Sequence, residues 1–339
     1  MNDRRSKPAS LETALDRRDQ IVHLDTTANP YGMTEHVGAV LAAGAMNQTP
    51  GQLESALRSR IAGFAGVPVR QVLVAGQIDE LIAHWLTQYL PDAPLIRFPP
   101  GPGAVPTPSR RHLIDVHRGP SFQPELDAET ASELPQGAIA YLMSPHDPSG
   151  ALAPARDIVR LARTCALVIV DQRHSGYTTR SLAALAREFD NVVVLQSLET
   201  WAALSAFPIS WVTGAGATLE RLGRPGPVAA GSLLAGIAVF EDRRTVLGNA
   251  RRVRDERSRL FRMLRKLNMI QPLPSWANFL LARIERGDRE TIHVGLAERG
   301  IMVAIPDDPA LERYLRISAG LPEDTDALRR ALVEISVTL

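Results

Sequence analysis

Two short apolar segments, each ending abruptly in polar residues, constrain the fold of this chain most strongly. LVIV at 167–170 is followed by Asp171, and VVVL at 192–195 is followed by a polar stretch that begins at Gln196. Segments this short and this rich in valine are typical of strands buried on both faces of a parallel sheet. Because ligands bind beyond the carboxyl ends of such strands, the polar residues there are the first candidates for function.

Helical and extended patterns alternate along the rest of the chain. Apolar residues recur at helical spacing over 52–66, and the segment 71–90 is predicted to form a strand, a tight turn and a helix. Another strand is predicted at 138–143, and a helix is predicted around 290–299. This alternation predicts an α/β fold with a central, mostly parallel sheet.

The length of 339 residues favours one large and one small domain. A helical pattern over 240–267 separates the long α/β stretch from shorter strand and helix patterns near the C-terminus. We therefore expect an N-terminal arm and loop at 1–35, a large α/β domain at 36–245 and a small α+β domain at 246–339. The helix at 240–267 is predicted to link the two domains.

The composition argues against several classes of function. The formal net charge is +1 and no block of one sign occurs, so neither nucleic acid nor a membrane is an expected partner. The single cysteine, Cys165, excludes an internal disulfide and a cysteine-rich metal site, and we expect it to be buried and inert. No metal site is predicted. The N-terminal residues lack the apolar segment of a secretory signal, so we expect a soluble, cytoplasmic protein.

Six motifs occur in the order in which one enzyme family carries them. They are NPYG at 29–32, AGQIDE at 75–80, SPHDPSG at 144–150, Asp171, SLET at 197–200 and YLRISAG at 314–320. On these motifs the chain resembles the fold-type-I, pyridoxal-phosphate (PLP) dependent aminotransferases of class I/II, in particular histidinol-phosphate aminotransferase and its threonine-phosphate decarboxylase relatives. The resemblance spans residues 21–337 and implies the PLP-transferase fold type I.

The resemblance implies that Asp171 pairs with the pyridinium nitrogen of the cofactor. It also implies that SLET replaces the family's Ser/Thr-x-Ser-Lys segment, which places Ser197 at a cofactor contact and Thr200 at the position of the Schiff-base lysine. The chain has only two lysines, Lys7 and Lys266, and neither lies in a matching motif. Without that amine no internal aldimine forms. Without the resemblance, Asp171 is equally well interpreted as a helix cap or as the hub of a hydrogen-bond network.

The turn after the predicted strand near residue 72 resembles the cofactor-phosphate loop of the family. There, backbone N–H groups at a helix N-terminus hold the phosphate. The resemblance places Gly76, Gln77 and Ile78 in this loop, with Gln77 and Ile78 in place of a glycine and a serine. Pro208 stands where the family has an arginine that reaches the phosphate.

The resemblance also places three residues around the cofactor ring. Asp147 replaces an asparagine that hydrogen-bonds the ring hydroxyl, and an ionised carboxylate there would repel a phenolate-like oxygen. His174 replaces a tyrosine that contacts the same hydroxyl, and it is the candidate for proton transfer; a structural histidine is the alternative. Gly101 stands where the family has a stacking aromatic, which favours a rigid surface loop in this segment.

Substrate and subunit contacts follow from the same resemblance. Arg316 matches an arginine that grips the substrate carboxylate, although a surface salt bridge is the alternative. Asn29 and Tyr31 match a loop that enters the active site, although a simple turn is the alternative. A homodimer is expected because the family builds its site between two subunits. Thr49 replaces the tyrosine that reaches the partner.

Three hypotheses remain open from the sequence. The first is an enzyme that transfers an amino group on a small amino acid or amino-alcohol phosphate. The second is a lysine-independent enzyme that binds pyridoxamine 5'-phosphate instead of pyridoxal 5'-phosphate and uses His174 as a base. The third is a non-catalytic binding or partner subunit, which is the function that a missing lysine favours.

Overall fold

The computed structural model describes residues 21–44, 51–101, 111–120, 122–124 and 126–338, without the side chain of the last of these. The N-terminal arm predicted at 1–20 and the dimer residue Thr49 lie outside this range. Cys165 is buried as expected, and burial raises the pKa of its thiol to about 12.

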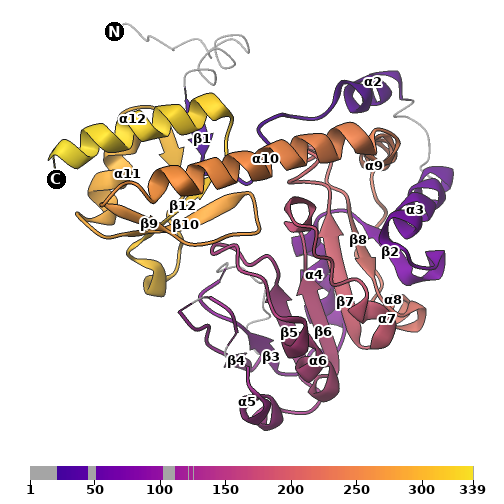
Figure 1. Ribbon diagram of the computed structural model, residues 1–339. Coiled ribbons are helices and arrows are strands. Elements are labelled where there is room, and N and C mark those ends of the chain that lie inside the picture. Colours follow the sequence, from indigo (N-terminus) through magenta and orange to yellow (C-terminus); the bar gives the residue numbers. More distant parts are fainter. Residues whose placement is uncertain (1–20, 45–50, 102–110, 121, 125, 339) are drawn as a thin grey trace, which may run out of the picture.

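A seven-stranded sheet forms the larger part of the molecule (Figure 1). Its central strands are rich in valine and isoleucine, and every residue of β5, β6 and β7 is buried, as expected for strands covered on both faces. All neighbouring pairs are parallel except those made by β8. In spatial order the strands are β2 (Val72–Ala75), β8 (Ser210–Thr213), β7 (Val192–Ser197), β6 (Leu167–Asp171), β5 (Ile139–Met143), β3 (Leu95–Arg97) and β4 (Leu113–Asp115).

Helices cover both faces of this sheet. One face packs on α4 (Ile78–Gln88) and α8 (Gly216–Leu222). The other face packs on α5 (Ala128–Glu133), α6 (Ala155–Thr164) and α7 (Leu185–Glu188). A separate apolar cluster beside β2 and β8 is formed by α2 (Glu35–Ala43), α3 (Gly51–Ala65) and α9 (Ala230–Glu241). Single 3₁₀ turns are η1 (Val69–Gln71), η2 (Ser175–Tyr177) and η3 (Pro309–Leu311).

The smaller part of the molecule contains two further sheets. An antiparallel sheet has the order β12 (Tyr314–Ser318), β10 (Phe279–Ile284) and β9 (Ile270–Pro272). The other sheet pairs β1 (Val22–Leu24) in parallel with β11 (Ile301–Val303), so the first described strand belongs to the C-terminal part. The helices α11 (Arg289–Ala297) and α12 (Pro322–Thr338) pack on these strands. The α/β fold with a mostly parallel central sheet and a smaller antiparallel one is therefore confirmed.

The predicted helix at 240–267 is wrong in its bounds. The structure ends α9 at Glu241 and begins α10 (Arg243–Leu264) after Asp242, which caps both helices with φ −99° and ψ 29°. The apolar spacing continues across this break, so periodicity alone did not reveal it. In Figure 1, α10 crosses from the large sheet to the small one. The domain boundaries given above remain a prediction.

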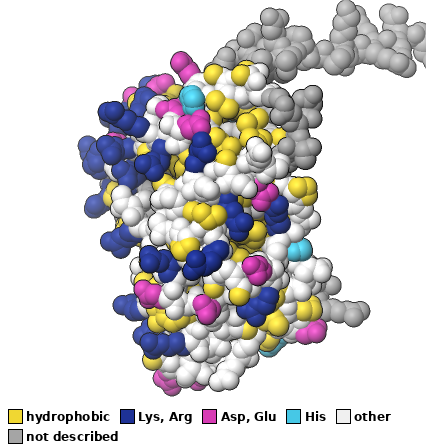
Figure 2. Space-filling view, turned by 90° about the vertical axis from the view of Figure 1, so that its right-hand side faces the viewer, with side chains coloured by type: hydrophobic (Ala, Val, Ile, Leu, Met, Phe, Trp, Pro, Cys, Tyr) yellow, Lys and Arg dark blue, Asp and Glu magenta, His cyan; other side chains and the backbone are white. Residues whose placement is uncertain are grey.

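The surface carries both signs of charge. Figure 2 shows Lys and Arg side chains gathered along one margin of the face on view, with acidic side chains among them. This mixture agrees with the formal net charge of +1. Across the described ranges, no helix is long and apolar enough to cross a membrane.

Candidate functional site

A pocket of about 280 Å³ lies at the carboxyl ends of β6 and β7. The strand register explains its position, because Asp171 is the partner of both Met143 on β5 and Leu195 on β7, so three strands end together. The predicted residues that line the pocket are Gln77, Ile78, Asp147, His174, Ser197 and Thr200. Three further charged residues line it that the sequence did not single out, namely Asp79, Arg173 and Glu199.

The Asp171 carboxylate lies beneath this pocket and is fully buried. It accepts hydrogen bonds from the Tyr141 hydroxyl at 3.0 Å, from the Arg173 backbone N–H at 2.9 Å and from Arg173 Nε at 2.9 Å. Burial acts to raise the pKa of the carboxyl, but the charge and hydrogen bonds of Arg173 outweigh it and the pKa lies below its ordinary value. Asp171 is therefore ionised, and both of its oxygens have partners within the chain.

Arg173 joins two carboxylates. Its Nη2 lies 2.7 Å from Asp171 Oδ2 and 2.7 Å from Asp79 Oδ1, and the second contact connects β6 with the first turn of α4. The contact between Arg173 and Asp79 could not be predicted from the sequence, because the two residues lie 94 positions apart in the chain. The only local signal was an arginine two positions after a strand-end aspartate.

Asp147 is also paired within the chain. Both of its oxygens accept from Arg316 Nη1, at 3.0 and 2.9 Å. Arg316 Nη2 donates to the Asp25 carbonyl at 2.7 Å, so the guanidinium ties β12 to the loop after β1. Arg316 does not line the pocket; the Asp147 carboxylate lies between the pocket and the guanidinium it binds.

SLET, at 197–200, lines one wall of the pocket. Thr200 Oγ1 donates to the Arg173 carbonyl at 3.2 Å, so the hydroxyl is used in fixing the backbone. Ser197 Oγ donates to Glu199 Oε1 at 3.2 Å. Burial raises the pKa of the Glu199 carboxyl, although the Ser197 hydrogen bond and the Arg173 charge oppose the shift.

His174 is nearly fully buried, at 2% exposure, and lines the same pocket. Neither ring nitrogen makes a hydrogen bond, and Nε2 lies 3.8 Å from Asp147 Oδ2. The ring packs edge-on against Phe279, with centroids 5.3 Å apart. Burial lowers the pKa of the imidazole to about 4, against the opposing effect of Asp147, so the ring is neutral at pH 7.

The predicted phosphate loop leads directly into α4. Gln77 is the extended N-cap of α4 and its side chain makes no capping bond, so backbone N–H groups of the first turn point toward the pocket end of the helix. The carbonyl of Gly76 accepts from Ser210 Oγ at 2.6 Å. Asp79 and Glu199 bring two carboxyl groups to the pocket that this helix end faces.

Asn29 and Tyr31 do not line the pocket. Asn29 Nδ2 donates to the Trp201 carbonyl at 2.8 Å, and Asn29 Oδ1 accepts from the Tyr31 backbone N–H. The Tyr31 ring lies under the Arg252 guanidinium at 3.8 Å. These contacts hold the N-terminal loop against the segment after β7, and a role in substrate binding stays a prediction.

Lysines are absent from the lining of this pocket over the described residues. Lys266 follows α10 and lines a different depression, between α10 and α12. Lys7 lies outside the described residues. Within the described part of the chain, no group of three or more His, Cys, Asp or Glu side chains is arranged to hold a metal ion.

Solved structures place this architecture in a known fold class. The chain is similar to a putative histidinol-phosphate aminotransferase from Erwinia carotovora atroseptica SCRI1043, with a TM-score of 0.85 and 18% identity over 94% of this chain and 97% of the other. It is also similar to histidinol-phosphate aminotransferase from Sinorhizobium meliloti in complex with pyridoxal-5'-phosphate, with a TM-score of 0.80 and 19% identity over 100% and 99%. The fold is therefore the PLP-transferase fold type I.

Sequence comparison gives the family. Aminotransferase class I and II matches residues 19–332, and the chain belongs to this family. It is 26% identical over 326 residues to histidinol-phosphate aminotransferase from Dehalococcoides mccartyi strain BAV1, covering 93% of this chain and 90% of that protein. It is 30% identical over 348 residues to histidinol-phosphate aminotransferase 1, chloroplastic, from Arabidopsis thaliana, covering 95% and 80%. The predicted family is confirmed.

Proposed function

We propose that this chain uses the aminotransferase fold to bind a small amino acid or amino-phosphate without forming a Schiff base, and that it is not a working transaminase. The observation that carries this proposal is the pairing of Asp171 with Arg173 at 2.7 Å, beside a threonine at position 200. By descent the protein is an aminotransferase of the histidinol-phosphate type. Arg173 and Arg316 are both paired with carboxylates of the chain, and these pairs favour a binding or partner subunit over a transaminase.

The residues around the pocket fit pyridoxal 5'-phosphate poorly. A pyridinium nitrogen would have to compete for Asp171 with Tyr141 and Arg173, which together donate to both of its oxygens. A phosphate dianion at the start of α4 meets the carboxyl groups of Asp79 and Glu199 in the same pocket. An aldimine requires an amine where Thr200 stands, and the described lining offers none.

His174 favours a second candidate function, a lysine-independent enzyme that binds pyridoxamine 5'-phosphate. A neutral, buried imidazole with two unbonded nitrogens is equipped to accept a proton from a ligand in this pocket. Such an enzyme needs no lysine. It does need Arg173 to release Asp171 when the cofactor binds, which makes it the second choice.

A homodimer and a cytoplasmic location belong to the same proposal. The relatives are named as aminotransferases, and the family resemblance implies a two-fold dimer. Light scattering on the purified full chain tests this directly. A mass near twice 36.9 kDa supports the dimer, and a mass near 36.9 kDa contradicts it.

The deciding experiment is a titration of the purified protein with pyridoxal 5'-phosphate and, separately, with pyridoxamine 5'-phosphate. Absorbance is followed, and intact mass is measured after borohydride reduction. We expect no covalent mass gain and no saturable aldimine band. A mass gain at a lysine would overturn the proposal, and saturable binding of pyridoxamine 5'-phosphate without trapping would favour the second candidate.

Ligand binding is tested in parallel with L-histidinol phosphate, the compound in the names of the relatives. Thermal unfolding is recorded with and without this probe in the absence of any cofactor, and amino transfer is assayed separately with pyridoxal 5'-phosphate and a 2-oxo acid as amino acceptor. A concentration-dependent rise in Tm without formation of an amino-transfer product supports a binding subunit. Turnover of the probe contradicts it.

A further inference from the structure

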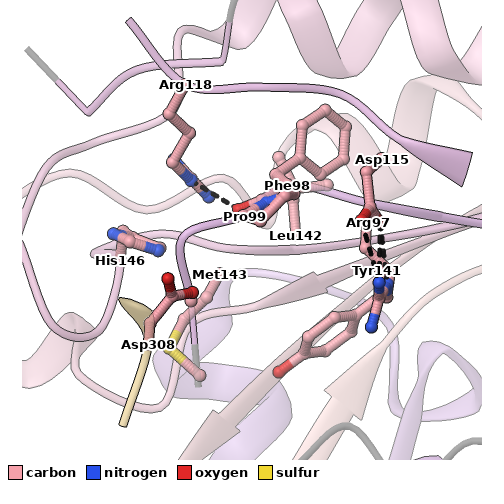
Figure 3. A pocket seen from close by; sticks show the side chains of 11 residues that line it. Arg97, Phe98, Pro99, Asp115, Arg118, Tyr141, Leu142, Met143, His146 and Asp308 are labelled. Carbon is pink, nitrogen blue, oxygen red and sulfur yellow. Dashed lines mark hydrogen bonds and ion pairs between the residues drawn. The ribbon is translucent and has the colours of Figure 1, made fainter. Parts of the chain in front are cut away.

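A second pocket, of about 240 Å³, lies beside the site just described and shares only Met143 with it (Figure 3). It opens at the carboxyl ends of β3 and β5, and it is walled by the segment from Arg97 to Gly101 and by Asp308 of the smaller part of the molecule. In Figure 3, Arg118 and Asp308 enter from opposite sides and His146 lies between them in this view. None of the functions considered above uses Arg118, His146 or Asp308.

Arg118 is a cation without a counter-ion among the described residues. Its Nε donates to the Phe98 carbonyl at 2.8 Å, and its Nη1 donates to the Phe122 carbonyl at 2.7 Å. Among the described residues, no Asp or Glu carboxylate forms an ion pair with the Arg118 guanidinium. Burial lowers the pKa of the guanidinium to about 9, so it is still charged at pH 7 and its charge is not compensated. Carbonyl acceptors thus hold two of its five N–H groups in place.

His146 contributes an unused polar atom to the same pocket. It is 1% exposed, its Nδ1 lies 2.7 Å from Ser149 Oγ, and its Nε2 makes no hydrogen bond. With its proton on Nε2, the neutral ring accepts the Ser149 hydroxyl proton at Nδ1 and presents an N–H donor to the pocket. Burial and the nearby Arg118 charge hold the pKa of the ring well below its ordinary value, against a weak opposing effect of the Pro100 carbonyl.

The other charged residues of the pocket restrict the kind of ligand that it can bind. Arg97 and Asp115 neutralise each other through two hydrogen bonds, at 2.9 and 3.0 Å, so neither is available. What remains is a guanidinium that two carbonyls hold but that has no counter-ion among the described residues, and a buried imidazole nitrogen, His146 Nε2, that makes no hydrogen bond. An oxyanion would supply the missing counter-charge and an acceptor for an N–H at Nε2.

We propose that this pocket binds a small oxyanion, a carboxylate or a phosphate group, between Arg118 and His146 Nε2. The Asp171 pocket is not involved, so this site and the proposed function stand independently. Asp308 limits the size and negative charge of the ligand that fits, since its carboxylate lines the same space.

Gly101 provides a steric test that leaves both donors in place. A Cβ built at Gly101 lies 3.5 Å from His146 Nε2 and 3.6 Å from the Phe98 carbonyl, which is ordinary van der Waals contact. Gly101→Ala is therefore tolerated by the fold, and its methyl group covers the ring nitrogen that the anion needs. Gly248→Ala is the matched control, because nothing lies within 4 Å of a Cβ there.

The experiment is calorimetric titration of the full chain with sodium acetate and, separately, with inorganic phosphate. We expect saturable binding of at least one probe, weakened at least about tenfold in Gly101→Ala and in Arg118→Gln but unchanged in Gly248→Ala. Acetate or phosphate as the tighter probe identifies the kind of oxyanion. Absence of saturable binding for both probes, or equal binding in wild type and Gly101→Ala, overturns the proposal. Neither probe is a cofactor, so this outcome is separate from the titrations that test the proposed function.

Discussion

The Asp147 carboxylate accepts two hydrogen bonds from Arg316 Nη1, at 3.0 and 2.9 Å, across the boundary between the large sheet and the small one. The resemblance to the aminotransferases implies that the arginine at this position binds a substrate carboxylate. In this structure the Arg316 guanidinium binds the carboxylate of Asp147 instead. As with Asp171 and Arg173, the pair is formed within the chain and needs no ligand.

Asp147→Asn should destabilise the protein because it leaves Arg316 partly buried without its counter-charge. The two side chains are 19% and 18% exposed, so we expect a loss of about 1–2 kcal/mol in the free energy of unfolding at pH 7, measured with urea. Asp115→Asn is the matched control, since it breaks the more exposed pair with Arg97 and should cost less than about 1 kcal/mol. Equal losses of unfolding free energy in the two variants would show that the Asp147–Arg316 pair stabilises the fold no more than the exposed Asp115–Arg97 pair does.

Arg173→Ala should cost about 3–5 kcal/mol at pH 7, because it leaves the Asp171 carboxylate fully buried without its cation. In the wild type the pKa of Asp171 lies below its ordinary value, so its contribution is present above that value and is lost as the pH falls. In the variant, burial alone raises the pKa, and acid then favours the folded state.

The difference in unfolding free energy between wild type and Arg173→Ala should therefore shrink as the pH is lowered from 6 toward 3. Urea unfolding at a series of pH values measures this change. The exposed Arg187→Ala is the control, and it should leave the stability at every pH close to that of the wild type. A gap that stays constant with pH would show that Arg173 does not act through Asp171.

Thr200→Lys combined with Arg173→Ala should allow pyridoxal 5'-phosphate to be trapped by borohydride, whereas Thr200→Lys alone should not. The double change supplies the amine and also removes the cation that pairs with Asp171. Ser205→Lys is the matched control, because it adds a lysine to the same pocket at an exposed position. Equal trapping in Ser205→Lys, measured by intact mass, would mean that the position of the amine does not matter.

His174 should make the protein sensitive to acid. Its pKa is about 4 in the folded state and about 6.5 when unfolded, so below pH 6.5 the unfolded chain takes up a proton that the folded chain does not. Stability should fall by on the order of 3 kcal/mol from this group between pH 6.5 and 4. His174→Leu should flatten that slope in urea unfolding, and the exposed His112→Gln should retain it. A parallel slope in His174→Leu would assign the acid sensitivity to other groups.

Ala203→Gly should stabilise the fold by about 0.5–1 kcal/mol. Ala203 has φ of 57°, in the left-handed region that favours glycine, so the Cβ carries a conformational cost. Ala83→Gly is the control, since Ala83 lies in the interior of α4 and should lose about 0.5–1 kcal/mol. Thermal unfolding of both variants distinguishes the signs.

The strand ends could be predicted from the sequence because burial on both faces imposes an unbroken valine-rich pattern. The pattern stopped at Asp171 and near Ser197, and both residues lie where the strands end in the structure. The partner of each side chain could not be predicted. Arg173 reaches Asp79 and Arg316 reaches Asp147 across long stretches of chain, and local periodicity carries no information about such contacts.

The helix break at Asp242 was missed for a related reason. Apolar spacing reports which face of a helix is buried, and that face is continuous through α9 and α10. The break depends on the backbone angles of one residue. The sequence predicts a turn at 144–150 but not how this loop packs. The unbonded Nε2 of His146 results from that packing, so it could not be predicted.

The parallel pairing of β1 with β11 also constrains the order in which the protein is built. Val22 lies opposite Ile301, so β1 is synthesised long before the strand with which it pairs. The large sheet can form while synthesis continues, because all of its strands lie between them in the chain. β1 thus gains its sheet partner only after every strand of the large sheet has been made, and during that interval its backbone N–H and C=O groups are open to other partners.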